Sequence, residues 1–152
     1  MRPHRLIAAL LLACAALVSG CGGGEEKNAY VDDVQAAQRT FATRFEQARK
    51  RLTATSTLAQ DRATLGDFQT ITRRFATTLE ELQPPDAVRA EHARLVAAIE
   101  GYGADVGRAR AKLRSGTSED RSAVRTELSS AVEGTQERIA RAVGDINAGL
   151  RE

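Results

Sequence analysis

The fold is decided by the stretch from Leu82 to Leu113, LQPPDAVRAEHARLVAAIEGYGADVGRARAKL. Its core-type positions, spaced alternately four and three residues apart, are Val88, His92, Leu95, Ile99, Tyr102, Val106, Ala109 and Leu113. This spacing places them on one face of an amphipathic helix, the face that packs against partner helices. Pro84 and Pro85 precede this face and Ser115-Gly116 follows it, so we predict a helix over about residues 86–114.

Three further segments have the same helical periodicity, and none alternates with the period of a strand. They predict helices over about residues 29–53, 60–82 and 118–150. Thr57 or Asp61 could cap the second of these helices, and Thr117 the last. Their expected core positions are Tyr30, Val34, Ala37, Phe41, Phe45, Ala48 and Leu52; Leu65, Phe68, Ile71, Phe75, Leu79 and Leu82; and Val124, Leu128, Val132, Thr135, Ile139, Ala142, Ile146 and Leu150.

Folding consecutive helices back on one another gives a test of this pattern. A turn at Ser56-Thr57 brings Phe45 opposite Phe68, and a turn at the prolines brings Gly66 opposite Gly101. In each of the three helix pairs joined by such turns, apolar residues then face apolar residues at nearly every level along the helices. We therefore predict an all-α, up-down-up-down antiparallel four-helix bundle. Isolated helical hairpins and a dimerising coiled coil are the alternatives.

The first twenty residues are typical of a signal peptide. Arg2 and Arg5 precede an uncharged run from Leu6 to Val18, whose ~20 Å length as a helix is short of a ~30 Å hydrocarbon core. Val18-Ser19-Gly20-Cys21 then resembles the lipobox of bacterial lipoproteins. The resemblance implies that residues 1–20 are removed and that Cys21 carries a diacylglyceryl group and a further acyl chain such as palmitate. Ordinary secretion and an uncleaved anchor are the alternatives.

The lipobox resemblance also implies a location. Residues 21–28 are interpreted as the lipidated cysteine and a flexible, glycine-rich tether, and residues 29–150 as the bundle. The layout is similar to that of small exported helical lipoproteins of actinobacteria. We therefore expect a protein anchored to the cell membrane by its lipid and facing outside the cytoplasm. Because Cys14 leaves and Cys21 is acylated, no disulfide is expected, and core packing alone must stabilise the domain.

Charge is balanced in total but uneven in placement. The chain has 22 basic and 20 acidic side chains, and Arg2 and Arg5 leave with the signal peptide, which argues against a nucleic-acid partner. The predicted bundle is acidic at the end nearest the tether and basic at the other end. This basic tip comprises Arg49, Lys50, Arg51, Arg108, Arg110, Lys112 and Arg114. It could bind an acidic envelope polymer or protein, or be an ordinary solvated surface.

His92 is the one histidine beyond the signal peptide, and it lies on a core face. No Glu-x-x-His motif accompanies it, so we expect no metal or cofactor. We expect it to bond Gln38 or a backbone carbonyl, with a pH-sensitive or ligand-contacting role as the alternative. Glycines flank Tyr102, which could mark close helix packing or a small pocket. The possible polar core layer comprises Tyr102, His92, Gln38 and Thr135.

No catalytic constellation can be assembled from the predicted helices. No exposed cysteine, serine triad, phosphate-binding glycine loop or facing pair of carboxylates is present on them. We therefore expect a protein that is not an enzyme but an interaction or assembly module of the cell envelope. The alternative is a small-ligand-binding or sensing bundle with a site near Tyr102 or His92. The pattern leaves the oligomeric state open.

Overall fold

The computed structural model describes residues 24–53, 55–113 and 117–152, and these residues form an all-helical bundle without a strand. Its four α-helices and one 3-10 turn are α2 (Glu25–Arg49), α3 (Leu58–Glu80), η2 (Asp86–Val88), α4 (Arg89–Lys112) and α5 (Ser118–Arg151). The predicted lipobox, Cys21 and Arg114 lie outside the described residues.

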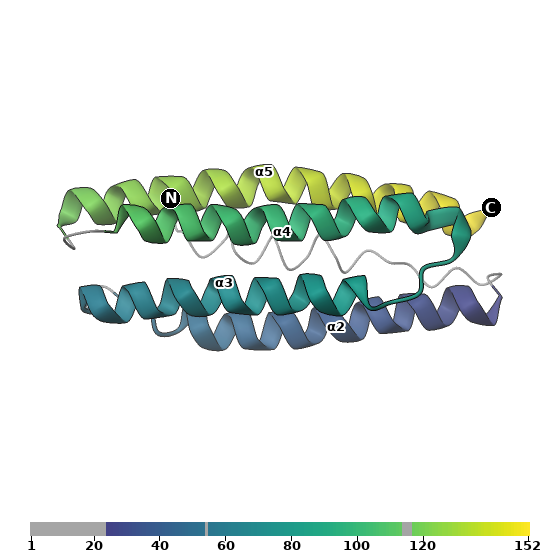
Figure 1. Ribbon diagram of the computed structural model, residues 1–152, viewed down its shortest axis with the longest axis horizontal. Helices are drawn as coiled ribbons and strands as arrows, with labels where there is room; N and C mark the ends of the chain where they lie inside the picture. Colours follow the sequence, from purple (N-terminus) through teal and green to yellow (C-terminus); the bar gives the residue numbers. More distant parts are fainter. Residues whose placement is uncertain (1–23, 54, 114–116) are drawn as a thin grey trace.

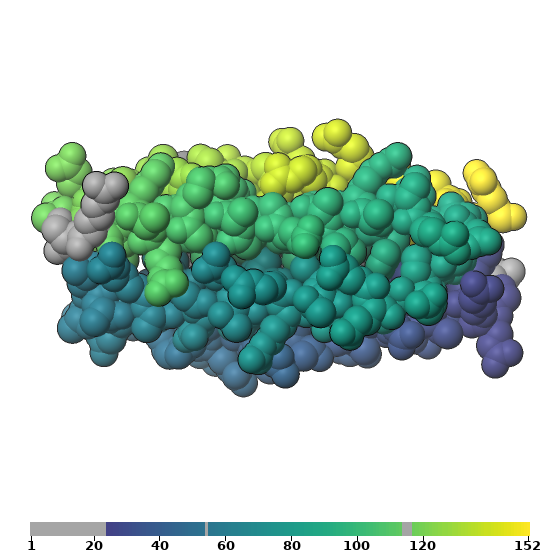
Figure 2. Space-filling view, in the orientation of Figure 1, coloured from purple at the N-terminus to yellow at the C-terminus, as the bar shows by residue number. Residues whose placement is uncertain are grey.

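The molecule is elongated, and the four helices lie along its length (Figure 1). The pairs that pack most extensively are consecutive in the chain: α2 with α3, α3 with α4, and α4 with α5. The start of α2, the proline connection and the end of α5 lie together at one end of the molecule (Figure 1). Figure 2 shows side chains of α3 and α4 meeting along most of its length.

Two of the helix starts follow directly from threonine caps. Thr57 caps α3 in a reciprocal capping box with Gln60, and the Thr117 hydroxyl accepts from the Asp120 amide at the start of α5. The start of α2 differs from the prediction, because the helix begins at Glu25 and includes part of the expected tether. Glu25 and Glu26 stabilise this first turn, since negative charge interacts favourably with a helix N-terminus.

The proline connection ends in a 3-10 turn before α4 begins. Pro85 precedes η2, whose last residue is the fully buried Val88. The backbone of Val88 is non-helical and directly precedes Arg89, the first residue of α4. Val88 packs against α5 at Gly149, where an added Cβ would lie 2.8 Å from Val88 Cγ1. The predicted helix over 86–114 is therefore a tight turn followed by α4, because the chain must first bring Val88 onto α5.

The core largely follows the predicted stripes. Every predicted core position from Val88 to Leu113 is buried. Leu52 is the exception on the first stripe, at 38% exposure, because α2 ends at Arg49 before another core-facing turn can form. On α3, Ile71 is half-buried while Thr72 is fully buried, so the buried face includes a threonine that a hydrophobicity pattern does not select.

Ring contacts confirm the predicted level of α2 against α3. Phe45 stacks on Phe68 with centroids 4.6 Å apart, and Phe41 stacks on Phe75 at the same separation. The predicted pairing of Gly66 with Gly101 is wrong, because Gly66 lies beside the guanidinium of Arg110. The connection before α4 is not a symmetrical turn about the prolines, so α4 is displaced along α3 relative to the expected register.

Candidate functional site

His92 connects three helices through both of its ring nitrogens. It is 6% exposed on α4, with Nε2 2.9 Å from the Leu79 carbonyl oxygen on α3 and Nδ1 3.0 Å from the Tyr30 hydroxyl on α2. Because a carbonyl oxygen can only accept, Nε2 donates to Leu79 and the Tyr30 hydroxyl donates to Nδ1. The predicted bond to a backbone carbonyl is confirmed, whereas the side-chain partner is Tyr30 and not Gln38.

Burial keeps this pair neutral. Desolvation lowers the pKa of His92, although the hydrogen bond to the Leu79 carbonyl partly opposes it. Desolvation also raises the pKa of Tyr30 to about 12. A ligand or proton could reach either ring nitrogen of His92 only by displacing an existing hydrogen bond. The arrangement therefore suits a structural link better than an acid, a base or a metal ligand.

Tyr102 and Thr135, two other members of the expected polar layer, are buried away from the His92 link and have contacts of their own. Tyr102 is 4% exposed and Thr135 is fully buried, and the Thr135 hydroxyl accepts from Arg138 Nη2 at 2.9 Å. Burial and the nearby Asp105 raise the pKa of Tyr102. A Cβ at Gly103 would lie 3.5 Å from Thr72 Cγ2, which is ordinary van der Waals contact. A methyl group would therefore fit at this flanking glycine, so the packing of α3 against α4 does not require a glycine there.

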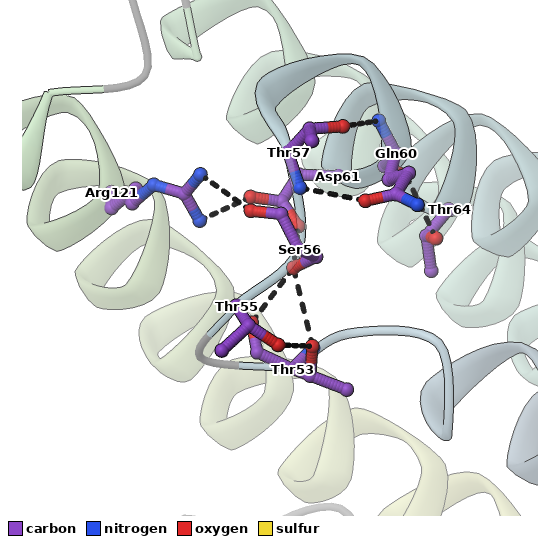
Figure 3. A network of polar contacts seen from close by, with 8 residues as sticks. All are labelled: Thr53, Thr55, Ser56, Thr57, Gln60, Asp61, Thr64 and Arg121. Atoms are coloured by element: carbon purple, nitrogen blue, oxygen red, sulfur yellow. Dashed lines mark hydrogen bonds and ion pairs between the residues drawn. The ribbon is translucent and has the colours of Figure 1, made fainter.

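A polar network at the far end joins α5 to the turn before α3 (Figure 3). Asp61 is 4% exposed, and its carboxylate forms an ion pair with Arg121 and accepts from the Ser56 hydroxyl at 2.5 Å. Arg121 Nη2 also donates to the Ser56 carbonyl at 3.0 Å. The buried carboxylate is therefore bound on both oxygens and holds the turn in place. Asp61 is not the cap of α3, because Thr57 has that role.

Most of the predicted basic tip is neutralised within the chain. The ion pairs are Arg49–Glu46, Arg51–Asp67, Arg108–Asp105, Arg108–Glu127 and Lys112–Glu127. Arg49 lowers the pKa of Glu46 by a hydrogen bond, and Lys112 lowers that of Glu127 in the same way. Within the described residues, Lys50 and Arg110 are the predicted tip cations that form no ion pair, although Lys50 also contributes to the lowered pKa of Glu46.

A different group of cations lies on the outside of α2 and α3. Arg39, Arg44, Arg73 and Arg74 are all exposed, and none of them takes part in an ion pair of the described chain. A shallow hollow, largely open to solvent, lies along the surface of α2. Its lining residues are Arg39, Thr40, Thr43, Arg44 and Gln47. This hollow was not predicted, because net charge by helix end does not show which cations have partners.

The described residues contain no cluster of three or more histidine, cysteine or acidic side chains arranged for a metal ion. Nor does any helix among them combine the length and apolarity needed to cross a membrane. Comparison of the chain with protein-family models, with curated proteins and with solved structures finds no match.

Proposed function

We propose that this protein is a membrane-anchored extracytoplasmic lipoprotein whose helical body is a non-catalytic interaction or assembly module of the cell envelope. In this proposal Cys21 carries the lipid, and the body is an up-down-up-down antiparallel four-helix bundle. The close lipobox match of Val18-Ser19-Gly20-Cys21 after an apolar run supports the anchor. Two or three acyl chains hold a protein stably on a membrane, whereas one holds it marginally.

The observation that carries the interaction role is the contrast between the interior and the surface. Inside, His92 bonds Tyr30 and Leu79, and Asp61 bonds Arg121, so these buried polar groups are committed to the fold. Outside, Arg39, Arg44, Arg73 and Arg74 of α2 and α3 form no ion pair in the described chain. Groups able to recognise another molecule are therefore on the surface, as expected of an interaction module.

The placement of the chain ends also supports this proposal. Lys27 Nζ on α2 donates to the Leu150 carbonyl at the end of α5, at 2.9 Å. A lipid attached a few residues before α2 would hold this end of the body near the membrane. The turn at Ser56 and the start of α5 would then point away from the membrane, with the sides of the helices accessible.

The anchor is tested by Cys21→Ser in the producing bacterium, with Cys14→Ser as the matched control. We expect the unchanged chain to sediment with membranes and its first tryptic peptide to begin at an acylated Cys21. Cys21→Ser should lose the acyl mass. Cys14→Ser should behave like the unchanged chain, because residue 14 lies in the predicted leader. An unchanged chain that keeps residues 1–20 and carries no acyl mass would show an uncleaved anchor instead.

A further inference from the structure

The middle of the α2–α3 layer has an unbalanced positive charge. Residues 37–45 contain Arg39 and Arg44, residues 68–79 contain Arg73 and Arg74, and neither segment contains an acidic side chain. The stacking of Phe41 on Phe75 and of Phe45 on Phe68 places the two segments at the same level of the bundle. Four exposed arginines therefore lie at the same level of the bundle, in two segments that lack the carboxylates that neutralise the tip.

The hollow on α2 combines these charges with hydrogen-bonding groups. Arg39 and Arg44 are separated by five residues, or about 7.5 Å of rise along the helix, which suits two separate anionic groups better than one. The Thr40 and Thr43 hydroxyls donate to the carbonyls of Ala36 and Arg39, each at 3.0 Å. Their oxygen lone pairs remain available as acceptors, so the hollow can bond hydroxyl groups as well as anions.

We propose that this face of α2 and α3, around Arg39 and Arg44, binds an anionic polysaccharide. Carboxylate or phosphate groups of the polymer pair with the arginines, for which the planar guanidinium is well suited. Sugar hydroxyls donate to Thr40 and Thr43 and bond the Gln47 amide. This proposal rests on the extracytoplasmic location proposed above, and it moves the binding surface from the basic tip to the side of the bundle.

Two other classes of partner fit this face less well. A stable protein interface has an apolar core, but no apolar side chain lines the hollow. Among the described residues, Leu52 is the one large hydrophobic side chain that is exposed. A helix that lies on a lipid surface likewise needs an apolar face to insert. A hydroxylated polyanion requires neither feature.

The test is binding of the full-length chain in a neutral detergent to polygalacturonate, a polysaccharide with one carboxylate per sugar. Arg39→Gln/Arg44→Gln should weaken binding about tenfold at low salt, because it removes two charge-assisted contacts. The control Arg125→Gln/Arg141→Gln removes the same charge from two exposed arginines of α5 that form no ion pair in the described chain, and should change binding less than twofold. Lys50→Gln/Arg110→Gln is a second control, which removes the same charge at the basic tip.

Several outcomes would overturn the proposal. They are no binding to polygalacturonate, equal losses in all three double variants, or a loss confined to the tip variant. Equal or tighter binding of poly-glutamate or of phosphatidylglycerol vesicles, lost in Arg39→Gln/Arg44→Gln, would assign the face to a protein or a lipid surface. Unchanged far-UV circular dichroism and melting temperature show that the variants fold. Because the polymer is added in solution, failure here is distinct from failure of the Cys21 experiment.

Discussion

His92 and Tyr30 form a hydrogen-bonded pair that links folding to pH. The pKa of His92 is lowered in the folded chain, whereas an unfolded chain protonates histidine near its ordinary value of about 6.5. Above this pH neither state is protonated, and the stability due to the neutral pair is fully present. As pH falls below about 6.5 the unfolded state binds the proton first, so stability is lost until pH passes the folded pKa.

We therefore expect the free energy of unfolding to decrease between pH 7 and pH 5.5, by no more than about 1.4 kcal/mol per pH unit. Urea unfolding followed by circular dichroism measures this slope. His92→Gln should be less stable at pH 7, because it disrupts a buried hydrogen-bonded link, but its stability should be nearly flat over this range. An unchanged slope in His92→Gln would assign the pH dependence to other groups.

Asp61 and Asp67 provide a matched comparison of two ion pairs. The Asp61 carboxylate is buried beside Arg121 and Ser56, whereas Asp67 and its partner Arg51 are each about half exposed. We expect Asp61→Asn to lower the free energy of unfolding by roughly 1.5–3 kcal/mol, since it removes the charge of a buried carboxylate and one of the two oxygens that accept from Arg121 and Ser56. Asp67→Asn should cost less than about 0.5 kcal/mol, because water already screens that pair. Urea titration of both variants measures the difference, and equal losses would contradict the assigned role of the buried pair.

The contacts that sequence reasoning missed have one physical cause. Folding consecutive helices against each other can pair α2 with α3 and α4 with α5, and it found the stacking of Phe45 on Phe68. The Tyr30–His92 bond joins α2 to α4, and the Asp61–Arg121 pair joins α3 to α5. Such contacts depend on how the whole bundle closes, and periodicity along one helix contains no information on that closure.

At the scale of the elements, local chemistry explains most boundaries. The capping threonines Thr57 and Thr117 could be identified because a hydroxyl placed before a helical pattern satisfies a free amide. The early start of α2 and the 3-10 turn before α4 could not be identified from the sequence, because tertiary contacts help to stabilise both. Lys27 bonds the end of α5, and Val88 packs against Gly149. At the start of α2 the Lys27 contact adds to the favourable charges of Glu25 and Glu26, whereas at Val88 tertiary packing overrides the weak local preference.

Two glycines of α5 should respond in opposite ways to alanine. A Cβ at Gly144 would meet no atom within 4 Å, whereas a Cβ at Gly149 would lie 2.8 Å from Val88 Cγ1 and 3.2 Å from the Ala87 carbonyl oxygen. Gly144→Ala should therefore raise stability by about 0.5–1 kcal/mol through helix propensity. Gly149→Ala should lower it by about 1–3 kcal/mol through overpacking against η2.

Thermal melting of the two variants under the same conditions distinguishes these effects, because both add the same methyl group to the same helix. A similar gain in both would show that the end of α5 moves freely away from η2. A similar loss in both would show that α5 is constrained at Gly144 by contacts beyond those described.

At the scale of the whole molecule, the location of the ion pairs decides which basic side chains remain available, and the number of charges at each end does not. The sequence predicts the all-helical class and a basic end, since both follow from residue order. It does not show that carboxylates such as Glu127 neutralise much of that end, because these pairs cross between helices or reach back one turn. The arginines on the side of α2 and α3 that form no ion pair with another described residue become apparent only when each ion pair is located.

The bond between Lys27 and the Leu150 carbonyl has a mechanical consequence. The start of α2 and the end of α5 meet at one end of the bundle (Figure 1). A pulling force applied through these two points would load that bond first and then peel α2 and α5 away from the bundle one turn at a time. Such unzipping resists force far less than shearing along the helix axes. The bundle should therefore yield at low force when held by both ends, and resist more when pulled between Glu25 and the turn at Ser56.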